Sequence, residues 1–238
     1  MKKASLTILV LLLFISCKKE VRVDFSEEII ETSEGAEIAL NFPKAEGTKD
    51  VTNRINQTIE NYIIEQINVS ESDTTNGNLN DAIAKFNNEY KRFNTDFPDA
   101  AQQWEAFIDG EVTHRSPEII SIAITSYLDT GGAHGNSSVR FFNFNPQTGE
   151  QLQTNDLVSN LQGLSEVVKK QLIIELKADN SDMEDVFFGK EFQLPETLGY
   201  SDEGLIVLYN PYEIASYSQG IVEFTIPFED INSFLKIN

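Results

Sequence analysis

The sequence IISIAITSYLDTGGAHGN, residues 119–136, runs from a strand pattern into a loop that holds three glycines and one of the chain's two histidines. Apolar residues alternate with small or polar ones over residues 119–128, which is typical of a β-strand. The glycines after this segment give the backbone access to conformations that other residues avoid. The pattern fits a catalytic loop around His134, and it also fits a tight structural corner.

Strand patterns lie on both sides of this stretch. Upstream, WEAFIDGEVTHRS (residues 104–116) alternates around Asp109-Gly110, a dipeptide that favours a hairpin turn. Downstream, VRFFNF (residues 139–144) is followed by PQTG (residues 146–149), a turn sequence that indicates another hairpin. AEIALNF (residues 36–42) also alternates and predicts an earlier strand.

Helical patterns flank these strands. Residues 51–69 place apolar side chains three and four positions apart, at Val51, Ile55, Ile59, Tyr62, Ile63 and Ile67. Residues 79–93 repeat this spacing, and a third helix is predicted within residues 161–177. Two buried strands, GLIVL (residues 204–208) and GIVEFTI (residues 220–226), and a short helix are predicted to close the chain.

These elements predict an α+β fold of two small modules, each an antiparallel sheet packed with helices. We place the N-terminal module at residues 34–138 and the C-terminal module at residues 139–238. The chain is long enough for a hydrophobic core in each, and its single cysteine excludes an internal disulfide.

The N-terminus has the pattern of a bacterial lipoprotein signal. MKK precedes an apolar run at residues 6–15, which is too short to span a bilayer permanently, and Cys17 follows it. Residues 1–16 are therefore predicted to be a lipoprotein signal peptide, Cys17 the lipidated residue, and residues 17–33 the lipidated cysteine and a tether. An ordinary signal peptide beside a buried thiol is the alternative. The lysine after Cys17 points to the outer membrane.

The chain is strongly acidic, with a formal net charge of −20. Removal of residues 1–16 takes away two lysines and no acid, which changes the charge from −20 to −22. This balance disfavours nucleic acid, whose phosphates need cationic partners. It favours basic partners through long-range attraction, although a solubility charge with no partner gives the same composition.

The glycine loop is the first candidate site. His134 can act as a general base with Asp129 orienting it, or the loop can bind a ligand. In the structural reading, Gly131, Gly132 and Gly135 adopt backbone angles closed to other residues, while the imidazole forms a hydrogen bond across the corner. His114 lies upstream, but two histidines without a carboxylate cluster predict no metal site. No cofactor is expected.

A second candidate lies near the C-terminus, where Tyr209, Tyr212 and Tyr217 cluster around Pro211. Aromatic residues beside proline often pack a corner of the core. Exposed tyrosines also form partner surfaces, so this cluster is a candidate aromatic surface.

Several of these motifs occur in an order that resembles a known family. The order is YLDTGGAHGN, FNFNPQTGEQL and NDLV, then GLIVLYNPYEIASYSQG and an IPF segment. From about residue 36 onward the chain resembles the extracytoplasmic region of RsiV-type anti-sigma factors. The same pair of modules occurs in PdaC-type peptidoglycan deacetylases and in envelope lipoproteins.

The resemblance implies a binding function. The anti-sigma factors bind lysozyme through this region, while the sigma-binding segment of that family and the catalytic domain of the deacetylases are not expected here. We therefore expect a lipid-anchored envelope protein without enzymatic activity that binds lysozyme-like or other basic proteins, or cell-wall material such as peptidoglycan. The alternative is a cell-wall glycan hydrolase or deacetylase with His134 and Asp129 in its site.

Overall fold

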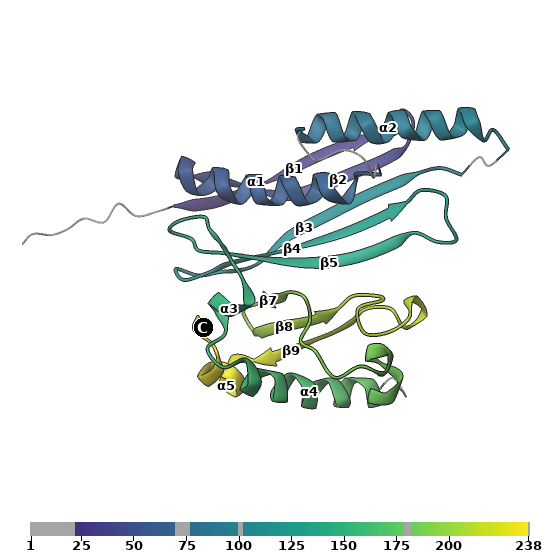
Figure 1. The fold of residues 1–238 in the computed structure, drawn as a ribbon. Helices are drawn as coiled ribbons and strands as arrows, with labels where there is room; N and C mark the ends of the chain where they lie inside the picture. The colour runs from purple at the N-terminus through teal and green to yellow at the C-terminus, as the bar shows by residue number, and fades with distance from the viewer. Residues whose placement is uncertain (1–21, 70–76, 100–101, 179–181, 238) are drawn as a thin grey trace, which may run out of the picture.

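The computed structural model describes residues 22–69, 77–99, 102–178 and 182–237. The predicted signal peptide and Cys17 lie outside these residues. Within them, no helix is both long enough and apolar enough to cross a membrane. The described chain forms the predicted α+β fold, in which helices pack on two separate sheets (Figure 1).

The first sheet has six strands in the order of the sequence. They are β1 (Val23–Thr32), β2 (Glu37–Gly47), β3 (Glu105–Arg115), β4 (Ile120–Asp129), β5 (Asn136–Phe144) and β6 (Gln151–Leu152). Neighbouring strands are antiparallel except for β2 and β3, which run parallel. A parallel pair needs a crossover, and here it consists of α1 (Lys49–Gln66) and α2 (Leu79–Asp96).

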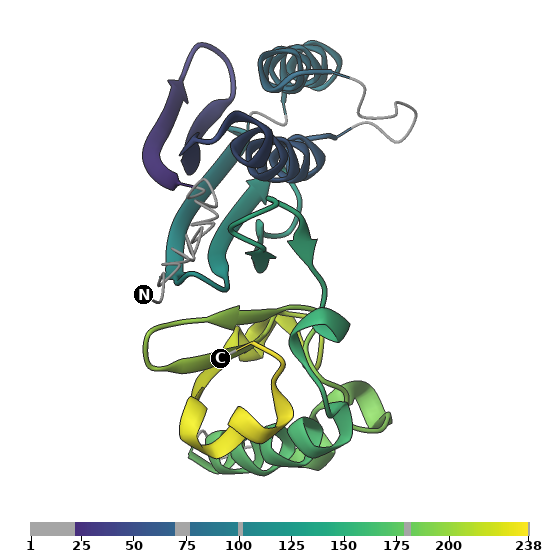
Figure 2. The ribbon, with the colours of Figure 1, turned by 90° about the vertical axis from the view of Figure 1, so that its left-hand side faces the viewer.

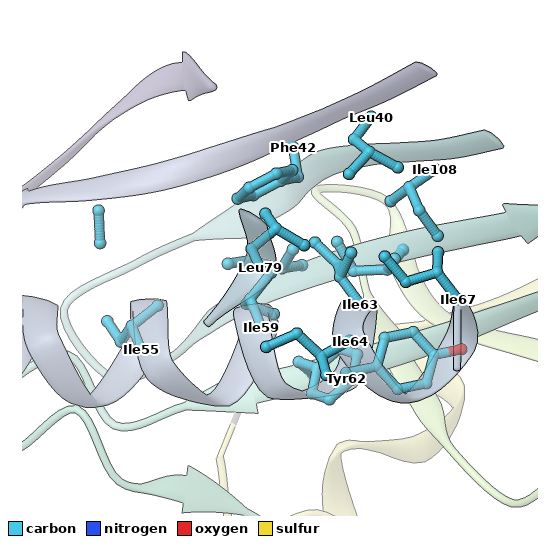
Figure 3. Close-up of a cluster of buried hydrophobic side chains, with 14 of the residues drawn as sticks. Leu40, Phe42, Ile55, Ile59, Tyr62, Ile63, Ile64, Ile67, Leu79 and Ile108 are labelled. Atoms are coloured by element: carbon cyan, nitrogen blue, oxygen red, sulfur yellow. The ribbon is translucent and has the colours of Figure 1, made fainter. Parts of the chain in front are cut away.

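Helix α1 supplies the side chains that fill the first core. Its predicted apolar face lies against the sheet, with Ile55, Ile59 and Ile63 almost fully buried. Figure 3 shows Ile59 and Ile63 beside Leu40, Phe42 and Ile108 of the strands, with Ile55 farther along the helix. The 3–4 spacing along the helix and the alternation along the strands therefore meet in one core, as the sequence predicts.

The second module is smaller. Its antiparallel sheet has three strands, β7 (Leu198–Tyr200), β8 (Gly204–Tyr209) and β9 (Val222–Pro227). Helix α4 (Leu161–Ala178) packs on this sheet, and the short helices α3 (Thr154–Leu157) and α5 (Phe228–Ile231) lie at one end. Figure 2 shows α1 and α2 at one end of the molecule, beside β1 and β2, and α4 at the other end, with the second sheet between them.

The two sheets pack face to face at β4 and β5. Ala123 and Phe141 form a small apolar cluster with Ile206 and Leu208 of β8. Hydrogen bonds flank this cluster: the Ser121 hydroxyl oxygen accepts from the Tyr200 amide at 3.0 Å, and the Asn143 side-chain amide donates to the Leu198 carbonyl at 2.7 Å. Residues 120–124 of β4 are therefore covered on both faces, and all five are buried.

Asn210 of the second module also connects the two modules, through hydrogen bonds to the backbone of β5. Strand β6 pairs only with residues 143–144 of β5, so β5 has no strand neighbour on that side at Val139. The Asn210 side chain accepts from the Val139 amide at 2.7 Å and donates to the Val139 carbonyl at 2.9 Å. One side chain thus completes the hydrogen bonds that another strand would make.

Three expectations about boundaries need correction. Most of the predicted tether is strand β1, an edge strand whose many charged residues obscured its alternation. The predicted module boundary between residues 138 and 139 falls inside β5, because the six-stranded sheet continues to Leu152. Asp109-Gly110 is not a turn: β3 passes straight through it, and a Cβ at Gly110 would lie 2.7 Å from Ile124 and 2.8 Å from Pro43.

The first core predicts a contrast between two isoleucines. Ile63→Ala should lower the free energy of unfolding by about 2–5 kcal/mol, because Ile63 is fully buried and its removal leaves a cavity. Ile174→Ala, at a helical position that is 52% exposed, should change it by less than about 0.5 kcal/mol. Urea denaturation of both variants measures the difference, and equal losses would contradict this account of the core.

Candidate functional site

The structure brings the two sequence candidates together at the junction of the modules. His134 lies in the loop between β4 and β5, and Tyr217 lies in the loop between β8 and β9. Their rings stack with centroids 3.9 Å apart and planes at 20°. The His134 Nδ1–H donates to the Gly135 carbonyl at 2.8 Å, and Nε2 lies 3.4 Å from the Tyr212 hydroxyl. We call His134, Tyr212 and Tyr217 the junction aromatics.

The tyrosine cluster divides into surface and core. Tyr212 is 55% exposed and lies 5.9 Å from the ring of Tyr217. Tyr212 also has a φ of +67°, an unfavourable backbone angle for a large side chain. Tyr209, by contrast, is buried in β8, its hydroxyl donates to the Gln193 carbonyl at 2.9 Å, and burial raises its pKa. Tyr209 is thus a core residue, and the predicted aromatic surface comprises the other two.

Asp129 has a different role from the predicted orientation of His134. Its Oδ1 accepts from the Gly131 amide at 2.9 Å, and the Gln102 side-chain amide lies 3.3 Å from both carboxylate oxygens. These bonds hold the start of the loop, while those of the His134 ring run to Gly135 and Tyr212. The arrangement is therefore that of a structural turn beside an aromatic stack, with no direct carboxylate–imidazole bond among the described contacts.

The three loop glycines have three different roles. Gly131 has a φ of +88°, which side chains disfavour. Gly135 is required by contact rather than by its backbone angle, since a Cβ there would lie 2.3 Å from the Tyr127 hydroxyl oxygen. Gly132 has neither constraint: its φ is not in the left-handed region, and the nearest atom to a Cβ would be 3.8 Å away. The prediction of special backbone angles is correct for Gly131 and wrong for the other two.

Tyr127 connects the loop to the face of the sheet that α1 and α2 leave uncovered. Its ring stacks on Phe107 of β3, with centroids 5.8 Å apart and planes at 12°. The pKa of the Tyr127 hydroxyl is raised, first by burial and then by the negative charges of Asp129 and Glu105. The junction aromatics therefore lie next to a second aromatic pair, Phe107 and Tyr127, and negatively charged carboxylates lie near Tyr127.

A groove of about 300 Å³ runs across this uncovered face, and none of the candidate sites predicted from the sequence includes it. We call it the open-face groove. The side chains that line it come from alternate positions of four strands: Ile29, Glu31, Ala39, Asn41, Phe107, Asp109, Thr125 and Tyr127. Alternation in residues 36–42 and 104–116 does place these residues opposite the core, but the pairing of β2 with β3 that brings them together joins segments far apart in the sequence.

The second histidine lies elsewhere. His114 Nδ1 is 2.9 Å from the Asp202 carboxylate, and its ring lies 6.3 Å from that of Tyr200. The two imidazoles therefore have separate partners. Among the described residues, no group of three or more His, Cys, Asp or Glu side chains is placed to hold a metal ion.

Two family comparisons match successive parts of the chain. Residues 29–137 match the family described as "Deacetylase PdaC", and residues 150–229 match the family described as "Protein of unknown function (DUF3298)". The first spans β1 to the glycine loop, and the second spans β6 to α5. The predicted resemblance to the modules associated with PdaC is thus confirmed. No curated protein gave a significant match.

Two solved structures have the same fold. A DUF3298 family protein from Pseudomonas aeruginosa PAO1 has 21% identity and a TM-score of 0.54, and a DUF3298 family member from Bacteroides fragilis NCTC 9343 has 20% identity and a TM-score of 0.60. Each comparison covers 90% of this chain and 93% of the other. At these identities the likeness establishes the two-module fold alone.

The glycine loop gives a matched pair of substitutions. Gly135→Ala should destabilise the protein by about 1–3 kcal/mol, because the new methyl group would overlap the Tyr127 ring. Gly132→Ala should be nearly neutral, since its methyl group has room. Thermal unfolding followed by tyrosine fluorescence measures both effects. Equal sensitivity at the two positions would show that Tyr127 does not impose the requirement for glycine.

Proposed function

We propose that this protein is a non-catalytic binding module of the bacterial cell envelope whose partner is a basic protein, such as a lysozyme-like hydrolase. The matches to the PdaC and DUF3298 families support a cell-wall-associated accessory role. The choice of binding over catalysis, and of a protein over peptidoglycan, rests on the site.

The observation that carries the proposal is the stack of His134 on Tyr217. These rings come from different modules, so the junction forms a composite aromatic surface that needs both modules in place. Aromatic side chains are common anchors at protein interfaces because they bury a large area with few rotatable bonds. Tyr212, exposed and held at a positive φ, adds a third ring to this surface.

Charge favours a basic partner. The chain has a net charge of −20, and the carboxylates of Asp129 and Glu105 lie close enough to Tyr127 to raise its pKa. A cationic protein would approach this surface faster than a neutral one, and its lysine and arginine side chains would meet aromatic faces. Peptidoglycan is the second candidate ligand, but the negative field gives it no comparable advantage.

The hydrolase or deacetylase alternative lacks a comparable supporting observation. The alternative places Asp129 as the group that orients the His134 imidazole. Here the His134 Nδ1–H donates to the Gly135 carbonyl instead, while the Asp129 carboxylate accepts from Gly131 and lies near Gln102. The Asp129–His134 pair that this alternative requires is therefore not formed among these contacts.

The proposal predicts binding that depends on the junction aromatics. The purified protein should bind a basic lysozyme, and Tyr217→Ala should weaken binding by about 1–3 kcal/mol if Tyr217 is an interface anchor. Leu161→Ala, which removes an exposed apolar side chain at the start of α4, should leave the affinity unchanged. Isothermal calorimetry measures these affinities.

A salt series and a turnover assay complete this test. The affinity for lysozyme should persist near physiological salt, because a shaped interface does not depend on charge attraction alone. An equally acidic unrelated protein serves as the control, and its affinity for lysozyme should fall as salt screens the charges. If this protein binds lysozyme no more tightly than the control does, lysozyme is not its partner. Cleaved or deacetylated products released from peptidoglycan, and lost in a folded His134→Ala variant, would replace binding with catalysis.

Localisation is a separate part of the proposal. The sequence of residues 1–17 supports export and lipidation at Cys17, which would tether the module to the envelope, with Lys18 favouring the outer membrane. A tethered binder would keep a captured partner at the membrane surface.

Lipidation predicts a loss of label on one substitution. Cells that express the protein and are fed a labelled fatty acid should incorporate the label, and Cys17→Ser should abolish it because serine has no thiol to acylate. Lys18→Ser at the next position should leave labelling intact. Label retained in Cys17→Ser would rule out Cys17 as the attachment site.

A further inference from the structure

We propose that the open-face groove is a docking site for one cationic side chain, arginine or lysine, projecting from the basic partner. This inference rests on the proposed function for the source of the cation. It assigns the site of contact to the groove formed by β1 to β4, outside the junction aromatics.

The groove contains a hydrogen-bond acceptor without a donor. The Asn41 side-chain amide donates to the Asp109 carboxylate at 3.4 Å, which fixes the orientation of the amide because its NH₂ end must face the carboxylate. Its Oδ1 is buried and has no hydrogen-bond partner among the described residues. Buried acceptors are normally satisfied. Because this oxygen is covered, an N–H donor in the groove would bind it as the half-buried Asn41 side chain turns outward.

The charge of the groove is negative. The ionisable carboxylates that line the groove are Glu31 and Asp109, and the lining contains no lysine or arginine. Neither carboxylate forms an ion pair within the described residues, although other acidic residues such as Glu28 and Asp24 do. The groove thus offers two anionic groups and a neutral acceptor, which complements the several N–H donors of a guanidinium or ammonium group.

The size and the apolar lining of the groove also suit a single long side chain. A volume of about 300 Å³ is at the lower end of ligand pockets and suits one side chain better than a folded element. The stacked rings of Phe107 and Tyr127 form part of its wall, and aromatic faces attract cations. Ile29, 59% exposed at the rim, can pack against the aliphatic stem of the incoming residue.

The position of the groove links it to the junction aromatics. Tyr127 is part of the groove wall, and its hydroxyl lies against Gly135 of the glycine loop. His134, the neighbour of Gly135, stacks on Tyr217. A protein seated on the junction aromatics can therefore place a side chain in the groove at the same time.

A sugar is the competing occupant, because sugars also stack on aromatic rings and donate hydroxyl hydrogens. Sugar hydroxyls need acceptors but not two unpaired carboxylates. The charge therefore favours the cation, and the sugar becomes an outcome of the test.

The test uses probes that differ only in charge. N-acetylargininamide should bind the purified chain, with amide shifts in the nuclear magnetic resonance spectrum confined to β1 to β4 and the adjoining glycine loop. The citrulline analogue, nearly isosteric but neutral, should bind at least about tenfold more weakly, as expected for the loss of charge-assisted hydrogen bonds. Equal binding of the two probes, or shifts elsewhere on the protein, would overturn the proposal, as would chitooligosaccharide binding in the groove where the arginine probe does not bind.

Two variants with the same charge change provide the control. Asp109→Asn should weaken binding of the arginine probe about tenfold or more while its amide oxygen still accepts from Asn41. Asp230→Asn, in the exposed helix α5 of the other module, should leave probe affinity unchanged. An equal loss of probe affinity in both variants would show that only net charge matters, and it would overturn the proposal that the probe binds in the groove.

The same variants separate this inference from the proposed function. If a basic lysozyme binds wild type and Asp109→Asn equally well, the groove is not its docking site and the inference fails while the binding function stands. If the arginine probe binds in the groove and lysozyme does not bind at all, the cation site stands and the proposed partner fails.

Discussion

The rest of the structure depends on the burial of residues 120–124 of β4 between two layers. On one face, Ile122 and Ile124 enter the core beneath α1, and on the other Ser121 and Ala123 contact the second sheet. A strand covered on both sides has its register fixed from both sides, because a shift by one residue would place isoleucines against the small contacts of β8 and small residues in the main core. This constraint fixes where β4 ends, and with it the position of the glycine loop.

The glycine loop uses that fixed position to bring the modules together at the surface. Gly131 turns the chain, Gly135 leaves room for the ring of Tyr127, and His134 is directed to Tyr217. Asn210, close in sequence to Tyr212, binds the backbone of Val139 on the next strand. The loop between β8 and β9 is therefore anchored beside the rings it contributes. A surface built from two loops is as well ordered as the contacts that hold those loops, and here the contacts are specific.

Local patterns in the sequence predict local structure well. The spacing of isoleucines in α1 and the alternation in β2 and β4 each identify an element, because one covered face is enough to impose a period. Local patterns mispredict the structure where a contact with a residue far away in the sequence determines the conformation. Gly110 reads as a turn but is a strand residue crowded by Ile124 and Pro43, and the charges of β1 hide an edge strand. The open-face groove is harder to predict from the sequence. Its Asn41–Asp109 contact depends on the parallel pairing of β2 with β3, which are connected by a crossover of two helices.

The size difference between the sheets decides which surfaces are left for binding. Three strands cannot cover six, so the second module covers β4, β5 and the end of β3 near His114, and leaves the same face of β1, β2 and the start of β3 open. An open face needs polar residues for solubility, and Glu31, Asn41 and Asp109 meet that need. Solubility alone, however, requires neither stacked rings nor a buried oxygen without a donor, and Phe107, Tyr127 and Asn41 provide these at the same place. The proposed cationic side chain would use both features at once, since its N–H groups would donate to the oxygen and its charge would lie over the rings.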